Sequence, residues 1–456
     1  MSYLEEYVSS FRKNGRVKIG FLGIGKSNMA LFSRLESVGN ADFVFRDQRE
    51  SLVLPEETIK NVSLKLGKDA LSDINEDVLF LSPSVRRDTP ELVSAKSRGI
   101  ALCSDCEVFF KYNSTPVIGI TGSDGKSTTT SLTSRILQDA GYSAPALGNI
   151  GAPMVTAHPS DYIVCELSSF NLEYLSPRLV ASAITNITEN HLNWHTSFEE
   201  YVEAKKNILR HSDKTVLSAD DPISQEIIKG CGAKSIFSTS LSYSELKRSF
   251  KADTYYTHSF GKIEKNGEFI ADTRDFLCQE DYNVKNMLTA LALTDEIIDP
   301  ASSLNSLRSF AGLEHRCERF LFKNGILFIN SSIDTTPQRT AKTLTALGKR
   351  VRIILGGRGK GLSYSPLRSP LNKYAERISV YGEARYEIED FFKREGIEAE
   401  YECFDTFYEC VAHALSGIES GDVLILSPAC TAYGEFSDFS ERGRCFKDLI
   451  KNFRKI

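Results

Sequence analysis

Residues 116–137 of the chain read PVIGITGSDGKSTTTSLTSRIL, and this stretch decides the fold. A short apolar run is followed by a loop with two glycines and then by a Ser/Thr-rich stretch, which predicts a buried strand, a tight turn and a helix. Backbone N–H groups in such a loop can approach phosphate oxygens, and the N-terminus of the following helix favours negative charge. The strict form of this motif has glycine where the chain has Ile120. The segment is therefore predicted to be a variant phosphate-binding loop.

The loop also carries the side chains that a bound triphosphate needs. We expect the ammonium group of Lys126 to neutralise phosphate charge, and a hydroxyl group of Ser127 or Thr128 to reach a magnesium ion. A plain glycine turn is the alternative, but Gly-Lys-Ser-Thr after an apolar strand seldom arises without a phosphate to bind. The residues predicted to bind the phosphates are Gly122, Ser123, Asp124, Gly125, Lys126, Ser127 and Thr128.

Two residues at the ends of nearby strands are candidate magnesium ligands. Glu166 ends the apolar run in VCELSSF, and His191 follows the run SAITNIT. Taken singly, a glutamate is most often solvated and a histidine is most often structural. Both residues fall at the carboxyl ends of strands, where an open α/β sheet binds its ligands, and oxygen ligands suit Mg²⁺. We therefore predict that they belong to the phosphate site.

Short Val-, Ile- and Phe-rich runs alternate with helical patterns along most of the chain, which is typical of βα units on parallel sheets. The chain has 456 residues, which is too long for a single core. The predicted fold class is α/β with three domains. We expect an N-terminal Rossmann-like domain at residues 1–113, a central P-loop domain at 114–313 and a C-terminal Rossmann-like domain at 314–456.

The composition argues against a nucleic-acid-binding or membrane protein. The formal net charge is −5, and no apolar run approaches the roughly 20 residues that span a bilayer. The first residues lack the basic-then-apolar order of a secretory signal, so we expect a cytoplasmic protein, and we expect it to be a monomer. Cys103 and Cys106 form a CxxC pair among ten cysteines. We interpret both as buried thiols and not as a redox or metal set.

Eight segments together resemble the Mur ligases, a family of amide-bond-forming enzymes, in their order and rough spacing. The resemblance covers about residues 17 to 446, and ELSSF, GNIG and the SPA segment are its most specific parts. The segments are TGSDGKSTTT (121–130), GNIGAP (148–153), CELSSFNLE (165–173), NITENHLNWH (186–195), YVEAKKNIL (201–209), NVKNMLTALAL (283–293), GLEHRCERF (312–320) and LSPACTAYGEF (426–436).

The resemblance, in particular to family members that add D-glutamate, implies the reaction. An ATP-dependent ligase of this kind would phosphorylate the carboxylate of UDP-N-acetylmuramoyl-L-alanine, with Mg²⁺ as cofactor. The amine of D-glutamate would then attack the acyl phosphate, and the product would be a precursor of cell-wall peptidoglycan. Water would hydrolyse the acyl phosphate, so the site must exclude it.

The resemblance also assigns roles to single residues. It implies that Lys126, His191 and Lys205 are catalytic and that Lys205 is carbamylated, although the sequence alone predicts a solvated helix lysine there. The residues that it assigns to magnesium are Ser127, Glu166, His191 and Lys205. Those assigned to the nucleotide, beyond the loop, are Asn283, Asn286 and Arg316. Those assigned to the UDP-linked substrate are Ser27, Asp47, Arg49 and Asn149, and those assigned to the amino acid are Thr335, Lys360 and Phe439.

The chain departs from the family pattern mainly in its C-terminal part. Ser331 and Ile333 stand where the family has an acid and a lysine, and Ala432 stands where a serine is common. Arg339, one helical turn beyond Thr335, could restore a cation if its side chain turns inward. The identity of the added amino acid is therefore less firmly predicted than the type of reaction.

The sequence leaves four alternatives open. The chain could be a Mur-type ligase for a different amino acid, such as L-glutamate, or a ligase of the folylpolyglutamate synthetase type. The loop GIGKSN (23–28) is half of a dinucleotide fingerprint and would suit an NAD-linked oxidoreductase, an interpretation that leaves Lys126 unexplained. A non-catalytic homologue that binds nucleotide is the fourth, and it would release no phosphate with any substrate pair.

Overall fold

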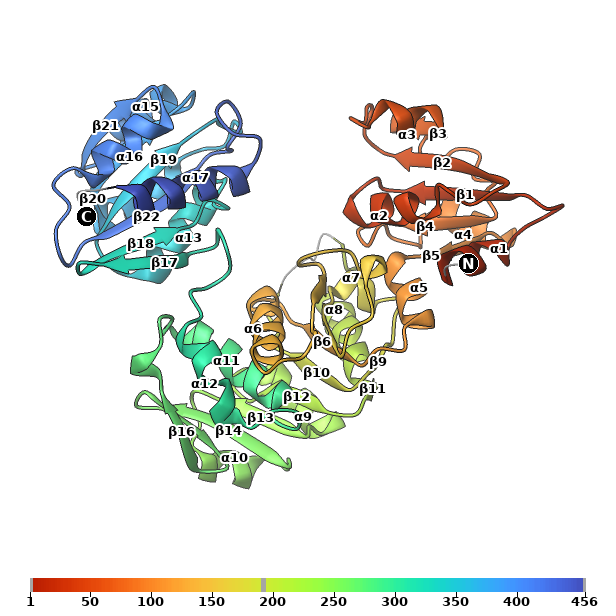
Figure 1. Cartoon of the computed structure of the whole chain (residues 1–456), viewed down its shortest axis with the longest axis horizontal. Coiled ribbons are helices and arrows are strands. Elements are labelled where there is room, and N and C mark those ends of the chain that lie inside the picture. Colours follow the sequence, from red (N-terminus) through yellow and green to blue (C-terminus); the bar gives the residue numbers. More distant parts are fainter. Residues whose placement is uncertain (1–2, 190–193, 454–456) are drawn as a thin grey trace. The chain divides into compact units, whose positions relative to one another are not determined.

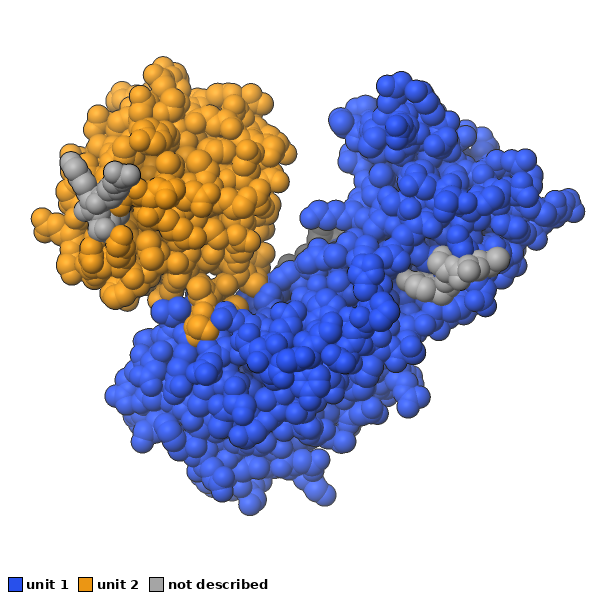
Figure 2. All heavy atoms as spheres, in the orientation of Figure 1, with its two compact units in different colours: residues 1–308 blue, residues 309–456 orange. Residues whose placement is uncertain are grey.

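The computed structural model describes residues 3–189 and 194–453. The chain divides into two compact units, residues 1–308 and 309–456 (Figures 1 and 2). Three large sheets, whose strands are mostly parallel and are joined by helices, confirm the predicted α/β fold class. No helix within the described ranges is both long and apolar enough to cross a bilayer.

The first sheet of unit 1 has the strand order of a Rossmann-type fold. Its five parallel strands lie in the order β3-β2-β1-β4-β5, so strand addition reverses between β1 and β4. Ligands bind sheets of this kind beside the switch point, at the carboxyl ends of the strands. The strands are β1 (Val17–Leu22), β2 (Ala41–Asp47), β3 (Val62–Leu66), β4 (Val78–Leu81) and β5 (Ala101–Cys103), and the helices are α1 (Tyr3–Ser9), α2 (Lys26–Leu35), α3 (Glu56–Lys60), α4 (Pro90–Ser97) and α5 (Asp105–Tyr112).

The second sheet of unit 1 contains the strand that precedes the phosphate loop. Its nine strands lie in the order β16-β15-β14-β13-β12-β10-β6-β8-β7, so β6 lies between β10 and β8. All are parallel except β15 and β16, which extend the sheet as an antiparallel hairpin. The strands are β6 (Val117–Thr121), β7 (Ala146–Gly148), β8 (Ile163–Glu166), β10 (Ala181–Ile184), β12 (Thr215–Ser218), β13 (Ser235–Ser238), β14 (Thr254–Ser259), β15 (Lys262–Lys265) and β16 (Glu268–Asp272); β9 (Arg178–Leu179) and β11 (His211–Ser212) pair separately.

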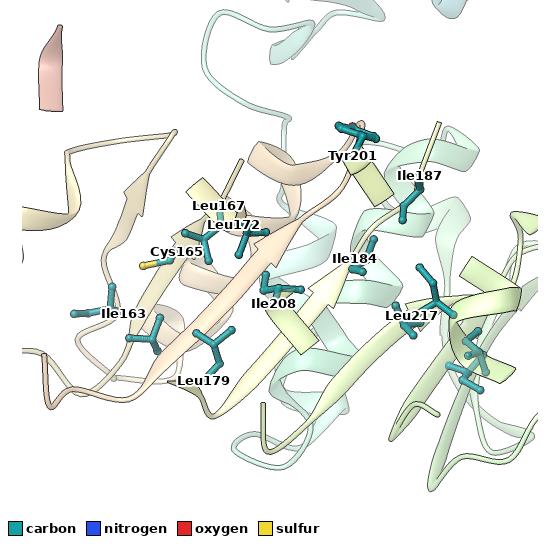
Figure 3. Close-up of a cluster of buried hydrophobic side chains, with 14 of the residues drawn as sticks. Ile163, Cys165, Leu167, Leu172, Leu179, Ile184, Ile187, Tyr201, Ile208 and Leu217 are labelled. Atoms are coloured by element: carbon teal, nitrogen blue, oxygen red, sulfur yellow. The ribbon is translucent and has the colours of Figure 1, made fainter. Parts of the chain in front are cut away.

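Apolar side chains from this sheet and its helices form one core (Figure 3). Ile163 and Cys165 of β8 and Ile184 of β10 are fully buried in it, because a parallel sheet covered by helices hides both of its faces. The longest helices here, α6 and α11, pack against each other. The helices are α6 (Lys126–Asp139), α7 (Ser169–Leu172), α8 (Phe198–Lys206), α9 (Pro222–Cys231), α10 (Tyr243–Ser249), α11 (Asp281–Thr294) and α12 (Leu304–Arg308).

Unit 2 is a separate α/β unit with its own core. Its six strands lie in the order β17-β18-β22-β19-β20-β21, and only the pairing of β17 with β18 is antiparallel. The strands are β17 (Glu318–Lys323), β18 (Ile326–Asn330), β19 (Val351–Gly356), β20 (Ala375–Tyr381), β21 (Glu400–Phe404) and β22 (Val423–Ala429), and the helices are α13 (Pro337–Leu347), α14 (Arg368–Tyr374), α15 (Arg385–Glu395), α16 (Phe407–Leu415) and α17 (Phe439–Asn452).

Candidate active site

The predicted strand, loop and helix are all present between Val117 and Asp139. β6 ends at Thr121, the loop follows, and α6 begins at Lys126. A Cβ atom on Gly122 would lie 1.9 Å from the Thr185 hydroxyl oxygen, and one on Gly125 would lie 2.3 Å from the Asn286 amide oxygen. Both glycines also have positive φ angles, +150° and +79°. Only glycine therefore fits at these two positions.

The loop is tied to the residues that follow β10. The Ser123 N–H group donates to the Asn186 carbonyl over 2.9 Å, and the Asp124 N–H group donates to the Asn186 amide oxygen over 3.0 Å. The Thr185 hydroxyl group donates to the Asp124 carbonyl over 2.6 Å. These bonds tie the loop backbone to the segment that follows a second strand, β10.

Lys126 folds back over the loop. Its ammonium group donates to the carbonyl oxygens of Gly122 and Ser123, each over 2.9 Å. Ser127 and Thr128, on the first turn of α6, are half-buried. The first turn of the helix thus brings one cation and two hydroxyl groups to the loop, which is the set that a triphosphate needs.

Lys205 is buried, so the interpretation of this residue as a solvated helix lysine is wrong. It lies on α8 and is 1% exposed, and its amine donates to the Gly122 carbonyl over 2.8 Å. Burial lowers the pKa of Lys205 well below its ordinary value, and the nearby charge of Lys126 lowers it further. Burial and the neighbouring cation therefore both disfavour the charged form of Lys205.

Glu166 lies beside the loop at the end of β8, where it pairs in register with Ile120. It is 4% exposed, and its Oε2 atom accepts no hydrogen bond from the described part of the chain. A buried carboxylate oxygen without a partner is costly unless a cation binds it. His191, the other predicted metal ligand, lies outside the described residues.

A cavity of about 300 Å³ brings several predicted residues together beside the loop. Asn149, Lys126 and Lys205 line it with Gly122, and Ser168 and Ser169 of the ELSSF segment line it as well. The two lysine side chains and the small polar groups suit an acidic or phosphorylated ligand. The predicted residues Asn283 and Asn286 lie on α11, and Asn286 accepts a hydrogen bond from Thr129 of α6 over 3.2 Å.

A second cavity, of about 590 Å³, lies at the switch point of the first sheet. Gly23, Asp47 and Arg49 line it, together with Arg86 and Trp194. The Asp47 carboxylate accepts from the Ile24 N–H group over 2.7 Å and pairs with Arg49, and this pairing lowers the pKa of Asp47 to about 2. Both side chains are thus fixed as a charged pair at the cavity wall.

Ser27 does not line this cavity, although it is predicted, like Asp47 and Arg49, to contact the UDP-linked substrate. Its hydroxyl group interacts with the buried carboxyl group of Asp105, at the start of α5. The side chain of Ser27 therefore faces the protein, whereas Asp47 and Arg49 face the cavity.

Within unit 2, two of the residues that are predicted to bind the incoming amino acid contact each other. The Lys360 ammonium group donates to the Thr335 hydroxyl oxygen over 3.1 Å. Phe439, which begins α17, packs edge to face on His315 with ring centres 6.0 Å apart. Arg316, the next residue, is exposed.

Sequence reasoning missed Tyr201 and Arg442. The hydroxyl oxygens of Tyr201 and Ser123 lie 2.8 Å apart, and the Tyr201 ring centre lies 4.5 Å from the amine of Lys205. Its position one helical turn before Lys205 is a signal that could have identified it.

Arg442 is fully buried and donates to Ser332, Tyr381 and several carbonyl groups. It ties the loops of unit 2 together, and no local pattern reveals this.

Comparison with known proteins identifies the family. The Mur ligase middle domain matches residues 120–294. The UDP-N-acetylmuramoylalanine–D-glutamate ligase of Clostridium beijerinckii is 33% identical over 451 residues, which cover 95% of this chain and 96% of the relative. The ligase of the same name from Ruminiclostridium cellulolyticum is 33% identical over 469 residues, 97% of each chain. The chain belongs to the Mur ligase family.

A solved structure shares the Mur ligase fold. The UDP-N-acetylmuramate-alanine ligase MurC of Thermotoga maritima matches with a TM-score of 0.56 at 21% identity, over 96% of this chain and 99% of that chain. At this identity, the likeness extends to the fold alone.

Replacing Gly122 by alanine tests the loop geometry of this Mur ligase. The added Cβ atom would collide with Thr185 and sit at a strained φ angle, so we expect affinity for MgATP to fall about 10-fold or more. Isothermal titration calorimetry measures the affinity for MgATP. Gly230→Ala, at an exposed helix position with no atom near its Cβ site, should bind MgATP as the unmodified chain does. Equal affinities of the two variants would contradict the geometry.

Proposed function

We propose that the chain is an ATP-dependent ligase that joins D-glutamate to UDP-N-acetylmuramoyl-L-alanine in peptidoglycan precursor synthesis. The observation that carries this proposal is 33% identity to ligases of that name over 95% of the chain. The contacts around Gly122 support it, because they combine a phosphate loop with a buried amine and a buried carboxylate.

The loop after β6 suits the phosphates of ATP. Gly122 and Gly125 keep side chains away from the loop backbone, and Lys126 adds a cation. Lys126 now contacts neutral carbonyl groups, and a charged phosphate is a stronger acceptor than either. We assign the phosphates to residues 122–128, and the adenosine part to Asn283, Asn286 and Arg316.

Glu166 suits a magnesium ion because one of its buried oxygens accepts no hydrogen bond from the described residues. Carboxylate and hydroxyl oxygens are the ligands that Mg²⁺ prefers. We assign the ion to Ser127, Glu166, His191 and a carbamylated Lys205. When bound, Mg²⁺ would neutralise the charge that develops on the transferred phosphoryl group.

The burial of Lys205 suits carbamylation. Only a neutral amine adds to carbon dioxide, and burial lowers the pKa of Lys205 in the direction that favours this form. The N–C bond forms, the nitrogen loses a proton, and the product is a carbamate anion. This anion would lie near the ammonium group of Lys126, which also contacts the Gly122 carbonyl.

The substrate carboxylate would react beside Lys126. One of its oxygens takes the γ-phosphoryl group of ATP, and ADP leaves. The free amine of D-glutamate attacks the resulting acyl phosphate, and the amide bond forms as phosphate leaves and the nitrogen loses a proton. Lys126 and the N–H groups of the loop spread the charge on the phosphoryl oxygens.

Each large sheet supports one part of this scheme. We assign the UDP-linked substrate to residues 1–113, with Ser27, Asp47 and Arg49 as its contacts, although Ser27 would have to turn toward the cavity. Asn149, from residues 114–313, is assigned to the same substrate. ATP is assigned to residues 114–313 and the amino acid to residues 314–456, through Thr335, Lys360 and Phe439. We also propose that the enzyme works as a monomer in the cytoplasm.

Phosphate release tests the proposal. It should require ATP, UDP-N-acetylmuramoyl-L-alanine and D-glutamate together, and Lys126→Ala should reduce it by about 1,000-fold or more because the loop loses its only lysine. Lys229→Ala, on the exposed face of α9, should change it little. Release that is driven equally well by L-glutamate, or by a folate in place of the UDP-linked substrate, would contradict the assignment.

Lys205→Ala tests the carbamate. The variant should lose most of its activity, and short carboxylic acids such as formate or acetate should restore part of it by supplying the missing anion. Lys206→Ala is the matched control, because that lysine is the next residue on α8 and pairs with Glu203 near the surface. If the Lys205→Ala variant were highly active without added acid, a carbamate role would be refuted.

A further inference from the structure

Two cations of unit 2 converge on the turn that links β18 to α13. Arg339 donates from its guanidinium group to the Ile333 carbonyl oxygen over 3.1 Å. Lys360, from the loop after β19, donates to the Thr335 hydroxyl oxygen over 3.1 Å. The acceptors are two residues apart on the same turn, so both cations lie at the carboxyl end of β18.

Neither cation has an acidic partner among the residues that the structure describes. The neighbouring Arg358, by contrast, makes two hydrogen bonds of 2.8 Å to Glu383. Asp334 lies in the same turn, but it is 5% exposed, and its Oδ2 atom accepts hydrogen bonds from Thr343 and Ser427, each over 2.8 Å. The Asp334 carboxylate is thus hydrogen bonded within the core. No acidic side chain among the described residues neutralises Arg339 or Lys360.

An acidic amino acid carries two carboxylate groups, and each favours a cation at its binding site. A guanidinium group binds a carboxylate through two parallel hydrogen bonds, and an ammonium group binds as a point charge. The carbonyl oxygen of Ile333 is a neutral acceptor, so a carboxylate would replace it readily as the partner of Arg339.

Accepting the proposed function, we infer that Arg339 is a specificity-determining residue for the incoming amino acid. It binds one of the two carboxylates, and Lys360 with Thr335 binds the other. The side chain of Ile333 offers Arg339 no charged partner, and the residue contributes only its backbone oxygen.

Steady-state kinetics of Arg339→Gln tests the inference. We expect the KM for D-glutamate to rise about 10- to 100-fold through loss of one charged hydrogen-bonding group. The KM values for ATP and for the UDP-linked substrate should stay unchanged, and kcat should change by less than about threefold. Lys342→Gln is the matched control, because it removes an exposed cation one turn further along α13.

Two amide analogues sharpen the test. D-glutamine lacks the side-chain carboxylate and D-isoglutamine lacks the α-carboxylate. Arg339→Gln should lose discrimination against one analogue and keep it against the other. An unchanged KM, a fall in kcat at constant KM, or unchanged discrimination against both would overturn the inference. If the unmodified enzyme released no phosphate with D-glutamate, the proposed function itself would fail instead.

Discussion

The carbonyl oxygen of Gly122 accepts a hydrogen bond from each of two lysines, and the site depends on this contact. Lys126 donates to it over 2.9 Å and Lys205 over 2.8 Å. Two ammonium groups on one oxygen would repel each other strongly away from water. The pKa of Lys205 is lowered by burial and by Lys126, which is the direction that relieves this repulsion. The Gly122 carbonyl thus holds both lysine side chains beside the loop.

The topology of the second sheet brings the other groups to this carbonyl. β6 lies between β10 and β8, so the loops after these three strands share one edge. The segment after β10 fixes the loop through Thr185, and β8 ends with Glu166 beside it. Glu166 and Thr185 both lie more than 40 residues after Gly122 in the sequence, and the sheet brings them to the loop.

Local pattern was enough to predict the strand, loop and helix at residues 117–139, because the apolar run, the glycines and the helix start are all local signals. The local pattern does not predict the burial of Lys205. YVEAKK contains two adjacent lysines, and only the tertiary contacts of α8 decide that Lys205 is buried on the Gly122 carbonyl while Lys206 reaches the surface. The side-chain direction of Ser27 is likewise set by a partner on a distant helix, Asp105.

In unit 2, too, the sequence pattern predicts some features and not others. Alternating apolar and helical segments predicted an α/β unit after residue 314, but the strand order of its sheet and the burial of Arg442 depend on contacts between segments far apart. Arg339 was expected to matter only if its side chain turned inward. The bond to the Ile333 carbonyl fixes its direction, and a rotamer of this kind cannot be derived from residue spacing.

Transfer of an oxygen isotope tests the central claim, that a carboxylate is phosphorylated beside Lys126. UDP-N-acetylmuramoyl-L-alanine labelled with ¹⁸O in its carboxylate would be converted with ATP and D-glutamate, and the released phosphate would be analysed by mass spectrometry. We expect one ¹⁸O atom in each phosphate, since the oxygen that leaves with phosphate comes from the substrate carboxylate. Phosphate without the label, or label found in AMP, would contradict it.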